Sequence, residues 1–378
     1  MKIIFGPLYD LNDINRGSGT FYNIQKELID QGHDVTLIKL IDDELPFLTK
    51  FFRYISKNFL KKRYFSYMDP FIAYRLGRKV ARKLNKKSYD CFLTNDYSIA
   101  SYLKIKSPIV LWTDSIFPRD YNSNKHPWLD NLSWFSIKFS HLIIEKALKN
   151  ISICIVPGIW NKKEILKYEI IDDEKVSIIP FGANIPDPKP NKNFHKRKLK
   201  DMIQFLFIGK DFEVKGLRLA ISIVQKLKNE GINVILNVIG NKRPCDQEHN
   251  HFIKYYGFLD KSDKEESKLL DSLYRKSDIF LMPSIAEGFG IVYGEAAAYG
   301  IPSLGFKTQG VTGAVKNNHS GKLLPIHSDE NDFIEAIYDW RNDLDNYKRF
   351  CQQARNHYEK NGKWDILITR FIKLIEFN

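Results

Sequence analysis

The sequence is poor in the features that mark membrane-spanning and disulfide-bonded proteins. No apolar run approaches the ~18 residues that a transmembrane helix needs, so we expect no such helix. Only four cysteines occur, and none has CxxC or metal-ligand spacing, which predicts free thiols in a reducing cytoplasm. The N-terminus lacks a basic start followed by a long apolar stretch, which argues against a secretion signal. These absences favour a cytoplasmic location.

Acidic residues are scarce in one segment. The net charge is +13, and residues 50–87 contain thirteen Lys or Arg and a single acid, Asp69. The rest of the chain is therefore close to neutral. One basic block favours a local anionic surface as partner. No recognised nucleic-acid-binding module accompanies the charge, so we expect no nucleic-acid partner.

The rest of the composition is that of a globular α/β protein. With 378 residues, 43% hydrophobic and 27% charged, the chain can form two domains that each have a core. In the first half, short apolar runs alternate with helical periodicity, which is typical of a parallel sheet covered by helices. The expected strands there are 2–6, 35–40, 91–94, 109–112, 152–156 and 176–179.

A change of composition separates the two halves. Residues 185–200 carry three prolines and many charges without periodicity, which is typical of a linker. The strand–helix pattern then restarts, with strands expected at 203–209, 234–239, 279–282 and 303–306. We therefore predict two domains, 1–185 and 200–361. Ligands of such sheets bind at the carboxyl ends of the strands, so the predicted site is the cleft between the domains.

The most informative stretch is residues 283–296, PSIAEGFGIVYGEA, which lies between an expected strand and a small-residue helix predicted at 295–299. Two carboxylates, Glu287 and Glu295, are separated by seven residues. The glycines between them let backbone amides approach a ligand closely. Amides that open a helix favour phosphate, and carboxylates accept hydrogen bonds from sugar or ribose hydroxyls. The pattern predicts a site for a sugar phosphate.

This stretch resembles the EX7E motif of retaining family-4 glycosyltransferases, also called glycosyltransferase group 1. That family has the GT-B fold, in which two Rossmann-like doubly wound domains face each other across a cleft. The resemblance extends over most of the second half. The further matching segments, in order, are 207–210 with 215–216, 238–240, 256–259, 304–311 and Trp364. In this family the last helix crosses back to the first domain, which implies that residues 362–378 pack there.

The resemblance implies a role for each matching residue. Glu287 would contact the sugar ring, and Glu295 would hold the ribose. Lys210 and Lys215 resemble the basic pair that grips the donor pyrophosphate, although the first member of that pair is usually Arg. The other donor-binding residues implied are Gly209, Gly240, Phe258, Gly288, Phe289, Gly290, Ile291 and Val292.

The first half resembles the family less closely. Gly17, Ser18 and Gly19 stand where the family has a glycine-rich loop near the donor phosphate, but a plain strand-to-helix turn explains them equally well. Residues 176–184 match the segment that joins the domains. The family usually has a histidine after the fourth strand, where this chain has Asp114. Asp114 either takes an acceptor-side catalytic role or caps the next segment.

The implied reaction moves a sugar from a nucleoside-diphosphate sugar to a glycan or lipid-linked acceptor with retention of configuration, as in surface polysaccharide or glycolipid synthesis. The protein would mainly stabilise the charge of the departing diphosphate, which can itself take the acceptor's proton. We expect no cofactor and no metal. The single DxD sequence, Asp343-Leu344-Asp345, falls in a helical stretch and suits a solvated face.

The basic block allows two interpretations. Within residues 47–63, Leu48, Phe51, Phe52, Ile55 and Phe59 recur at helical spacing, and the lysines fall away from that stripe. The stripe either packs on the core, or it lies with residues 47–87 on an anionic membrane near a lipid-linked acceptor. The second interpretation makes the protein peripheral at the inner face of the membrane.

Two other functions stay open from the sequence. The chain could be another GT-B enzyme, such as a sugar epimerase or phosphorylase, or a non-catalytic binder of sugar nucleotides. The paired lysines and both glutamates favour a hexosyl-type transferase (EC 2.4.-.-). Donor sugar, nucleotide base, acceptor, linkage and oligomeric state are not encoded in the spacing of motifs.

Overall fold

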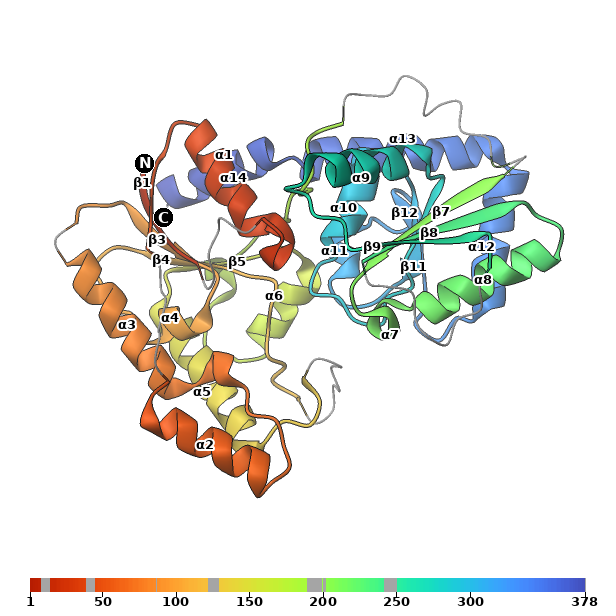
Figure 1. Ribbon diagram of the computed structural model, residues 1–378. Helices are drawn as coiled ribbons and strands as arrows, with labels where there is room; N and C mark the ends of the chain where they lie inside the picture. The colour runs from red at the N-terminus through yellow and green to blue at the C-terminus, as the bar shows by residue number, and fades with distance from the viewer. Residues whose placement is uncertain are drawn as a thin grey trace. The chain divides into compact units, whose positions relative to one another are not determined.

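The computed structural model describes residues 1–7, 14–38, 45–85, 87–121, 129–188, 199, 202–240 and 250–377 (Figure 1). The chain divides into two compact units. The N-terminal unit comprises Met1–Arg16 and Phe21–Ile179, and the C-terminal unit comprises Gly17–Thr20 and Pro180–Asn378. Most of the predicted linker, 185–200, lies outside the described residues.

The N-terminal unit is built on a six-stranded parallel sheet of order β2-β1-β3-β4-β5-β6. Its strands are β1 (Lys2–Gly6), β2 (Asp34–Leu37), β3 (Cys91–Thr94), β4 (Ile109–Trp112), β5 (Ile153–Val156) and β6 (Val176–Ile178). Its helices are α1 (Thr20–Asp30), α2 (Phe47–Asn58), α3 (Pro70–Leu84), α4 (Tyr97–Tyr102), α5 (Trp134–Asn150) and α6 (Ile159–Leu166). Helix α4 packs against both α3 and α5.

The central strands of this sheet are apolar because both of their faces are covered. Every residue of β3, β4 and β5 is buried, which fits a parallel sheet that has helices on both sides. The described cysteines, Cys91, Cys154 and Cys351, are buried and form no disulfide with one another. Helix α3 begins sharply because Asp69 accepts hydrogen bonds from the backbone N–H groups of Phe71 and Ile72.

The C-terminal unit repeats the architecture with the strand order β12-β11-β10-β7-β8-β9, again all parallel. Its strands are β7 (Ile203–Gly209), β8 (Val234–Gly240), β9 (Ile253–Gly257), β10 (Ile279–Leu281), β11 (Ser303–Phe306) and β12 (Gly321–Leu324). Its helices are α7 (Phe212–Lys215), α8 (Leu217–Asn229), α9 (Lys264–Lys276), α10 (Ile291–Ala298), α11 (Val311–Ala314), α12 (Glu330–Asn342), α13 (Leu344–Asn361) and α14 (Trp364–Glu376). Helix α8 packs with α12, and α10 packs with α13 (Figure 1).

The predicted strands are confirmed to within one to three residues. Strands β9 and β12 were not expected, because IKYYG and GKLL are short sheet-edge sequences that alternate weakly. The helix predicted at 295–299 begins earlier, at Ile291, directly after Gly290. Glu295 therefore lies inside α10 and not at its start. In the DxD sequence, Asp343 is the N-cap of α13 and accepts from the backbone N–H of Asn346.

Candidate functional site

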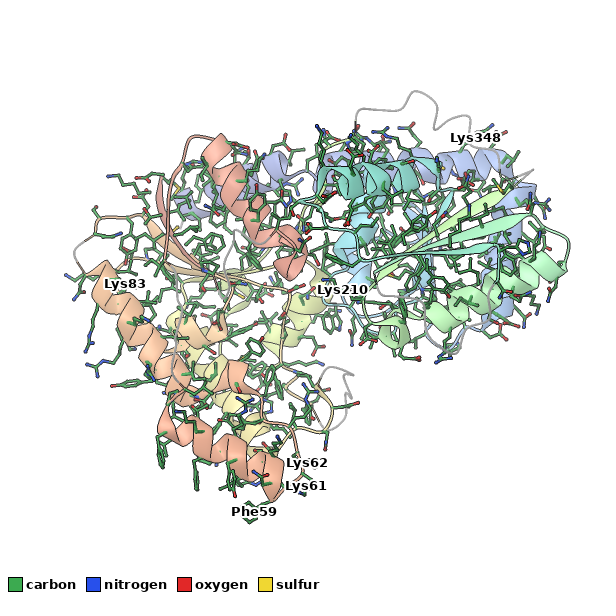
Figure 2. The ribbon with its side chains drawn as sticks, viewed as in Figure 1. Phe59, Lys61, Lys62, Lys83, Lys210 and Lys348 are labelled. Carbon is green, nitrogen blue, oxygen red and sulfur yellow. The ribbon has the colours of Figure 1, made fainter. Side chains whose placement is uncertain are left out.

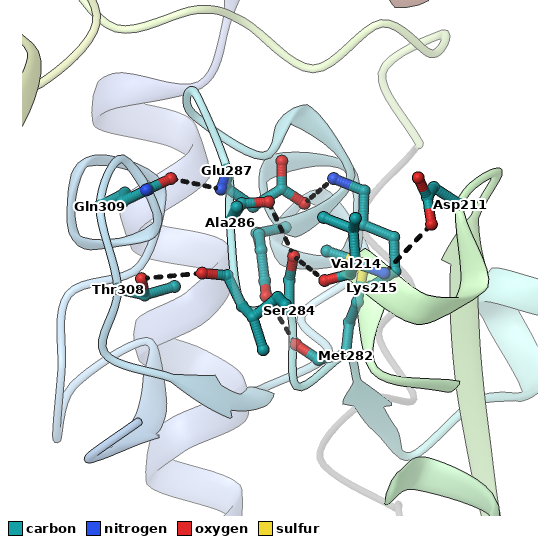
Figure 3. A network of polar contacts seen from close by, with 11 residues as sticks. Asp211, Val214, Lys215, Met282, Ser284, Ala286, Glu287, Thr308 and Gln309 are labelled. Carbon is teal, nitrogen blue, oxygen red and sulfur yellow. Dashed lines mark hydrogen bonds and ion pairs between the residues drawn. The ribbon is translucent and has the colours of Figure 1, made fainter. Parts of the chain in front are cut away.

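The central contact of the site is an ion pair between Lys215 and Glu287. Lys215 Nζ lies 2.7 Å from Glu287 Oε1, and the side chains are only 14% and 9% exposed. Lys215 ends α7, a single turn whose N-cap Asp211 accepts from the backbone N–H of Val214 at 3.1 Å. Figure 3 shows the Lys215 ammonium next to the carboxylate of Glu287, which lies in the segment that follows β10. The sequence predicted both residues, and the structure brings them together.

The segment that carries Glu287 is anchored through its backbone. The backbone N–H of Ile285 donates to Val214 O, and the Ser284 hydroxyl lies between Val214 O and Ala286 O. Gln309 Oε1 accepts from the backbone N–H of Glu287 at 3.0 Å (Figure 3). The Glu287 carboxylate therefore sits on a fixed backbone, which suits a group that must meet a ligand in one geometry.

Glycines give the segment its tight path into α10. Gly290 has φ 86° and is the N-cap residue of α10. At Gly310, a Cβ atom would lie 1.8 Å from Gly288 O, so only glycine allows this close approach. The first turn of a helix leaves backbone N–H groups without intrahelical partners, and it carries roughly half a positive charge. The N-terminus of α10 and Lys215 thus both add positive charge to the segment around Glu287.

Phe289 contributes differently from the other residues of this turn. Its side chain is 3% exposed and packs edge-to-face against Phe181, with ring centroids 5.8 Å apart. Phe289 therefore holds the turn through packing, and only its backbone is available to a ligand.

Glu295, the second predicted carboxylate, is 1% exposed and held on both oxygens. Lys261 Nζ lies 2.5 Å from Oε1, and the Tyr274 hydroxyl donates to Oε2 at 2.8 Å. Burial and the nearby Glu295 charge raise the pKa of Tyr274 well above its usual value, so its proton stays in place to donate. Sequence reasoning missed Lys261 and Tyr274. No local pattern could have identified Lys261, because it lies 34 residues from Glu295.

The ends of β7 and β8 come close because both end in glycine. At Gly240, with φ 134°, a Cβ atom would lie 1.9 Å from Gly209 O. At Gly209, a Cβ atom would lie 2.7 Å from Lys215 Cγ, so the lysine stem passes directly over this position. Both glycines thus have a packing role that shapes the place of Lys215.

Lys210 does not join Lys215 at Glu287. Its ammonium lies 4.5 Å from the centroid of the Phe258 ring, and Phe258 is 45% exposed. The sequence predicted both residues for the donor site, and the structure pairs them with each other.

The predicted glycine-rich loop has an unusual backbone. Gly17, Ser18 and Gly19 have φ values of 55°, 57° and 84°, so three consecutive residues are left-handed. For Ser18, which has a Cβ atom, this conformation is strained. The Asn184 side chain holds the loop by donating to Ser18 O at 2.8 Å and to Thr20 Oγ1 at 3.0 Å. The role of this loop near the donor phosphate stays a prediction.

In the N-terminal unit, Asp114 follows β4 and is half-buried. Its Oδ1 accepts from the Ser115 hydroxyl at 3.2 Å, and its backbone carbonyl accepts from Asn161. Between Asp114 and α5, the described residues contain no α-helix for it to cap. Its acceptor-side role stays a prediction.

A second acid of this unit was not predicted. Asp96 follows β3, and burial raises the pKa of its carboxyl to about 7. Its Oδ1 accepts from the backbone N–H of Ser98 at 2.7 Å, whereas its buried Oδ2 has no hydrogen-bond partner among the described residues. The dipeptide Asn95-Asp96 before a helix signals an N-cap and nothing more.

Two absences concern only the described residues. Among them, no group of three or more His, Cys, Asp or Glu side chains could hold a metal ion. None of the helices within these ranges is long and apolar enough to cross a membrane.

The basic block forms α2, α3 and the segment between them. Helix α2 buries Thr49 and Ser56, and the Ser56 hydroxyl donates to Ser133 Oγ at 3.0 Å. Phe52 also faces inward, with its ring 5.1 Å from that of Phe135. Leu48, Phe51 and Phe59 of the stripe do not pack on the core, because they are 43%, 47% and 72% exposed, whereas Ile55 is half-buried. The core-packing interpretation is therefore wrong for most of the stripe.

A family model matches part of the C-terminal unit. Residues 188–357 match the family model "Glycosyl transferases group 1". The predicted resemblance to that group is thus confirmed over residues 188–357, a range that includes Lys215, Glu287 and Glu295.

Curated relatives match about half of the chain. A D-inositol 3-phosphate glycosyltransferase of Paenarthrobacter aurescens is 26% identical over 212 residues, 53% of this chain and 51% of the relative. UDP-Gal:alpha-D-GlcNAc-diphosphoundecaprenol alpha-1,3-galactosyltransferase of Escherichia coli is 26% identical over 191 residues, 47% and 48% of the two chains. The chain thus spans about half the length of these relatives.

Solved structures match the whole chain. Sucrose-phosphate synthase of Thermosynechococcus elongatus superposes with a TM-score of 0.70 at 13% identity, covering 100% of this chain and 99% of that one. Anabaena Alr3699/HepE in complex with UDP superposes with a TM-score of 0.67 at 14% identity, covering 100% of both chains. At such identities the likeness concerns the fold, and the predicted GT-B fold is confirmed.

Proposed function

We propose that this chain transfers a sugar from a nucleoside-diphosphate sugar to an acceptor hydroxyl. The observation that carries the proposal is the buried Lys215–Glu287 pair on a rigid backbone at the N-terminus of α10. It lies within the range that matches glycosyl transferases group 1. An epimerase or phosphorylase of the same fold stays the alternative.

The charges suit the departure of a diphosphate. As the bond between sugar and phosphate breaks, negative charge grows on the leaving oxygen, and fixed positive groups stabilise it. Lys215 and the amides of Gly288–Val292 would supply that charge, and Glu287 would contact the sugar. The leaving diphosphate would take the acceptor's proton, which requires the acceptor hydroxyl to approach the sugar from the same face that the diphosphate leaves. The sugar would therefore keep its anomeric configuration. A non-catalytic binder of sugar nucleotides would bind the donor but release no nucleotide from it.

Lys210 would add a second positive charge after a side-chain movement. A cation–π contact at an exposed position contributes ~0.5–1 kcal/mol, and Lys210 lies over the half-exposed Phe258 ring. A charge-assisted hydrogen bond to phosphate contributes more, about 1.5–3 kcal/mol. Lys210 can therefore leave the ring for the diphosphate, and the free ring would face the base.

The first test is release of the nucleotide from UDP-, GDP-, ADP- and TDP-sugars by purified protein, with Lys215→Ala as the variant. We expect one nucleotide series to react and Lys215→Ala to lower kcat/KM at least about 100-fold, because it removes one stabilising group of the transition state. Lys215→Arg would keep part of the rate.

The matched control is Lys348→Ala in α13, where the lysine pairs with Asp345, whose side chain is 93% exposed (Figure 2). Its kcat/KM should equal that of the unchanged protein. Full activity and full donor binding in Lys215→Ala would contradict the proposal.

The acceptor is proposed to be lipid-linked, with the protein peripheral at the inner face of an anionic membrane. Helix α2 has three faces that follow from its spacing. Thr49, Phe52 and Ser56 face inward; Phe47, Phe51 and Tyr54 lie on the opposite side; Lys50, Arg53 and Lys57 lie between.

The outward face combines what an interfacial helix needs. Phe47, Phe51 and Tyr54 are 79%, 47% and 59% exposed. Figure 2 shows Phe59, Lys61 and Lys62 beyond the C-terminal end of α2. Aromatic side chains flanked by lysines bind at the boundary between headgroups and acyl chains. The scarcity of acids in residues 50–87 favours anionic lipid over a protein partner.

Charge reversal tests this surface. Changing Lys57, Lys61 and Lys62 to Glu should weaken binding to phosphatidylglycerol-containing vesicles at least about 100-fold, since each lysine contributes ~1 kcal/mol at such a surface. Sedimentation with the vesicles measures the binding, and the melting temperature should stay unchanged. Phe51→Ser should also weaken binding without any change of charge.

A control triple changes Lys254, Lys264 and Lys276 of the C-terminal unit to Glu, which alters the net charge equally. It should bind the vesicles normally. The membrane proposal would be wrong if the Lys57, Lys61 and Lys62 variant still bound the vesicles, or if both triple variants lost vesicle binding to the same extent.

A further inference from the structure

The two partners of Glu295 differ in their freedom to move. Tyr274 is fully buried and stacked on Tyr299, with ring centroids 4.8 Å apart and an interplanar angle of 6°. Lys261 lies between β9 and α9, and its side chain is 22% exposed. Tyr274 is therefore a fixed hydrogen-bond donor to one oxygen of the Glu295 carboxylate. The longer and more exposed Lys261 side chain holds the other oxygen and has more freedom to move.

Lys261 also reaches a second segment of the same unit. Its ammonium donates to Asn184 O at 3.0 Å as well as to Glu295. The Asn184 side chain donates to Ser18 O and accepts from Trp364 Nε1 at 3.0 Å. One continuous chain of hydrogen bonds therefore runs from the Glu295 carboxylate to the strained loop Gly17–Gly19.

The groups at the two ends of this series of hydrogen bonds, Glu295 and the loop Gly17–Gly19, are predicted to contact the same ligand. The resemblance implies that Glu295 holds the ribose and that Gly17–Gly19 lies near the donor phosphate. These groups are 276 or more residues apart in sequence. Lys261 and Asn184 supply that connection.

A carboxylate can hold Lys261 and a ribose together. It has about four lone-pair sites, and Glu295 accepts one hydrogen bond from Lys261 and one from Tyr274. The two contacts fix the plane of the carboxylate, so that the remaining acceptor sites have one direction. A hydroxyl bound in one direction is recognised more strictly than one bound to a rotating group.

We propose that Lys261 is a positioning residue, which orients Glu295 toward the ribose hydroxyls of the donor and, through Asn184, couples that contact to the loop Gly17–Gly19. The inference rests on the proposed function. It adds a specificity-determining residue that lies outside the matched motifs.

The test compares the ribonucleoside diphosphate that the unchanged protein binds most tightly among UDP, GDP and ADP with its 2′-deoxy analogue, using calorimetric dissociation constants; UDP and 2′-deoxy-UDP stand for that pair below. The unchanged protein should prefer UDP at least about tenfold, because the deoxy analogue leaves a buried acceptor without its hydroxyl. In Lys261→Met, the affinity for UDP should fall and the preference should drop to about twofold or less. Lys261→Arg, which keeps the cation, should retain most of the preference.

Lys264→Met is the matched control, because Lys264 is exposed and lies three residues further along the chain. It should behave like the unchanged protein. Equal melting temperatures of the two Met variants would separate loss of positioning from loss of folding. If Lys261→Met is unstable, Lys261→Gln, which removes the cation but keeps a polar side chain, provides the same comparison.

Two failures are distinguishable. If the unchanged protein binds none of UDP, GDP, ADP and TDP, the proposed function itself fails. If it binds UDP but Lys261→Met keeps the full preference or binds UDP more tightly, only the positioning role is overturned, and a tighter complex would mean that Lys261 competes with the ribose.

Discussion

The C-terminal unit contains two ion pairs that are largely buried, Lys215–Glu287 and Lys261–Glu295. Removing one partner of a buried ion pair costs about 3–5 kcal/mol, yet replacing both by apolar groups is often neutral. Stability alone therefore does not require either pair. Each pair holds its lysine and its glutamate in place before a ligand binds. Such preorganised charges need no reorganisation during the reaction.

Asp96 offers a residue-scale prediction for pH. Burial raises its pKa to about 7 in the folded protein, whereas an unfolded chain has ~3.9. The folded state thus holds the extra proton between these values, so the free energy of unfolding falls as pH rises from about 4 to 7. Asp96→Asn removes this loss, on the order of a few kcal/mol. Urea unfolding at pH 5 and pH 8 measures it.

The side-chain oxygen of the Asp96→Asn variant could still accept from the Ser98 N–H, so the helix cap should survive. The unchanged protein should lose more stability than Asp96→Asn between the two pH values. The same loss in both proteins would show that Asp96 is ionised throughout this range.

At the scale of elements, the turn between α7 and α8 decides where Lys215 points. Gly216 is the C-cap of α7 and directly precedes α8, and its φ is 76°. A Cβ atom at this position would lie 2.1 Å from Pro283 O. The turn and the segment before Glu287 therefore touch through their backbones. This contact ties the lysine and the glutamate into one geometry although they lie on different strand–helix connections.

Gly216→Ala should disturb both stability and the site. The left-handed backbone alone costs about 1–2 kcal/mol for a residue with a Cβ atom, and the Pro283 carbonyl must also move. We expect a loss of stability beyond that range together with weaker UDP binding. Chemical unfolding and calorimetry measure the two effects.

Gly231→Ala provides the comparison, because Gly231 has φ 83° and a Cβ atom there would meet no atom of the described residues within 4 Å. It should show only the backbone cost and normal UDP binding. Equal effects of the two substitutions would mean that the contact with Pro283 is unimportant.

At the scale of the whole molecule, charge and chemistry are separated. Twelve of the thirteen net positive charges come from residues 50–87 in the N-terminal unit, and the rest of the chain taken together is close to neutral. The pairs Lys215–Glu287 and Lys261–Glu295 lie outside this block, in the C-terminal unit. The proposed binding of residues 47–87 to an anionic membrane would account for this uneven distribution of charge.

Periodicity and spacing by themselves determined the two parallel sheets, most strand limits and the position of Glu287 before a glycine-containing turn into a helix. These features follow from neighbours in sequence: apolar runs make buried strands, and glycines before a helix make an anion site. The edge strands β9 and β12 were not predicted because their sequences, IKYYG and GKLL, have too weak an apolar pattern.

Only the tertiary structure decided the contacts between distant segments. It paired Lys261 with Glu295, Asn184 with Ser18 and Lys210 with Phe258, and it left Phe51 and Phe59 exposed. A sequence shows which face of a helix is apolar but not what covers that face, and it shows a lysine but not which carboxylate lies beside it. Those outcomes depend on how the chain packs in three dimensions, which local spacing does not encode.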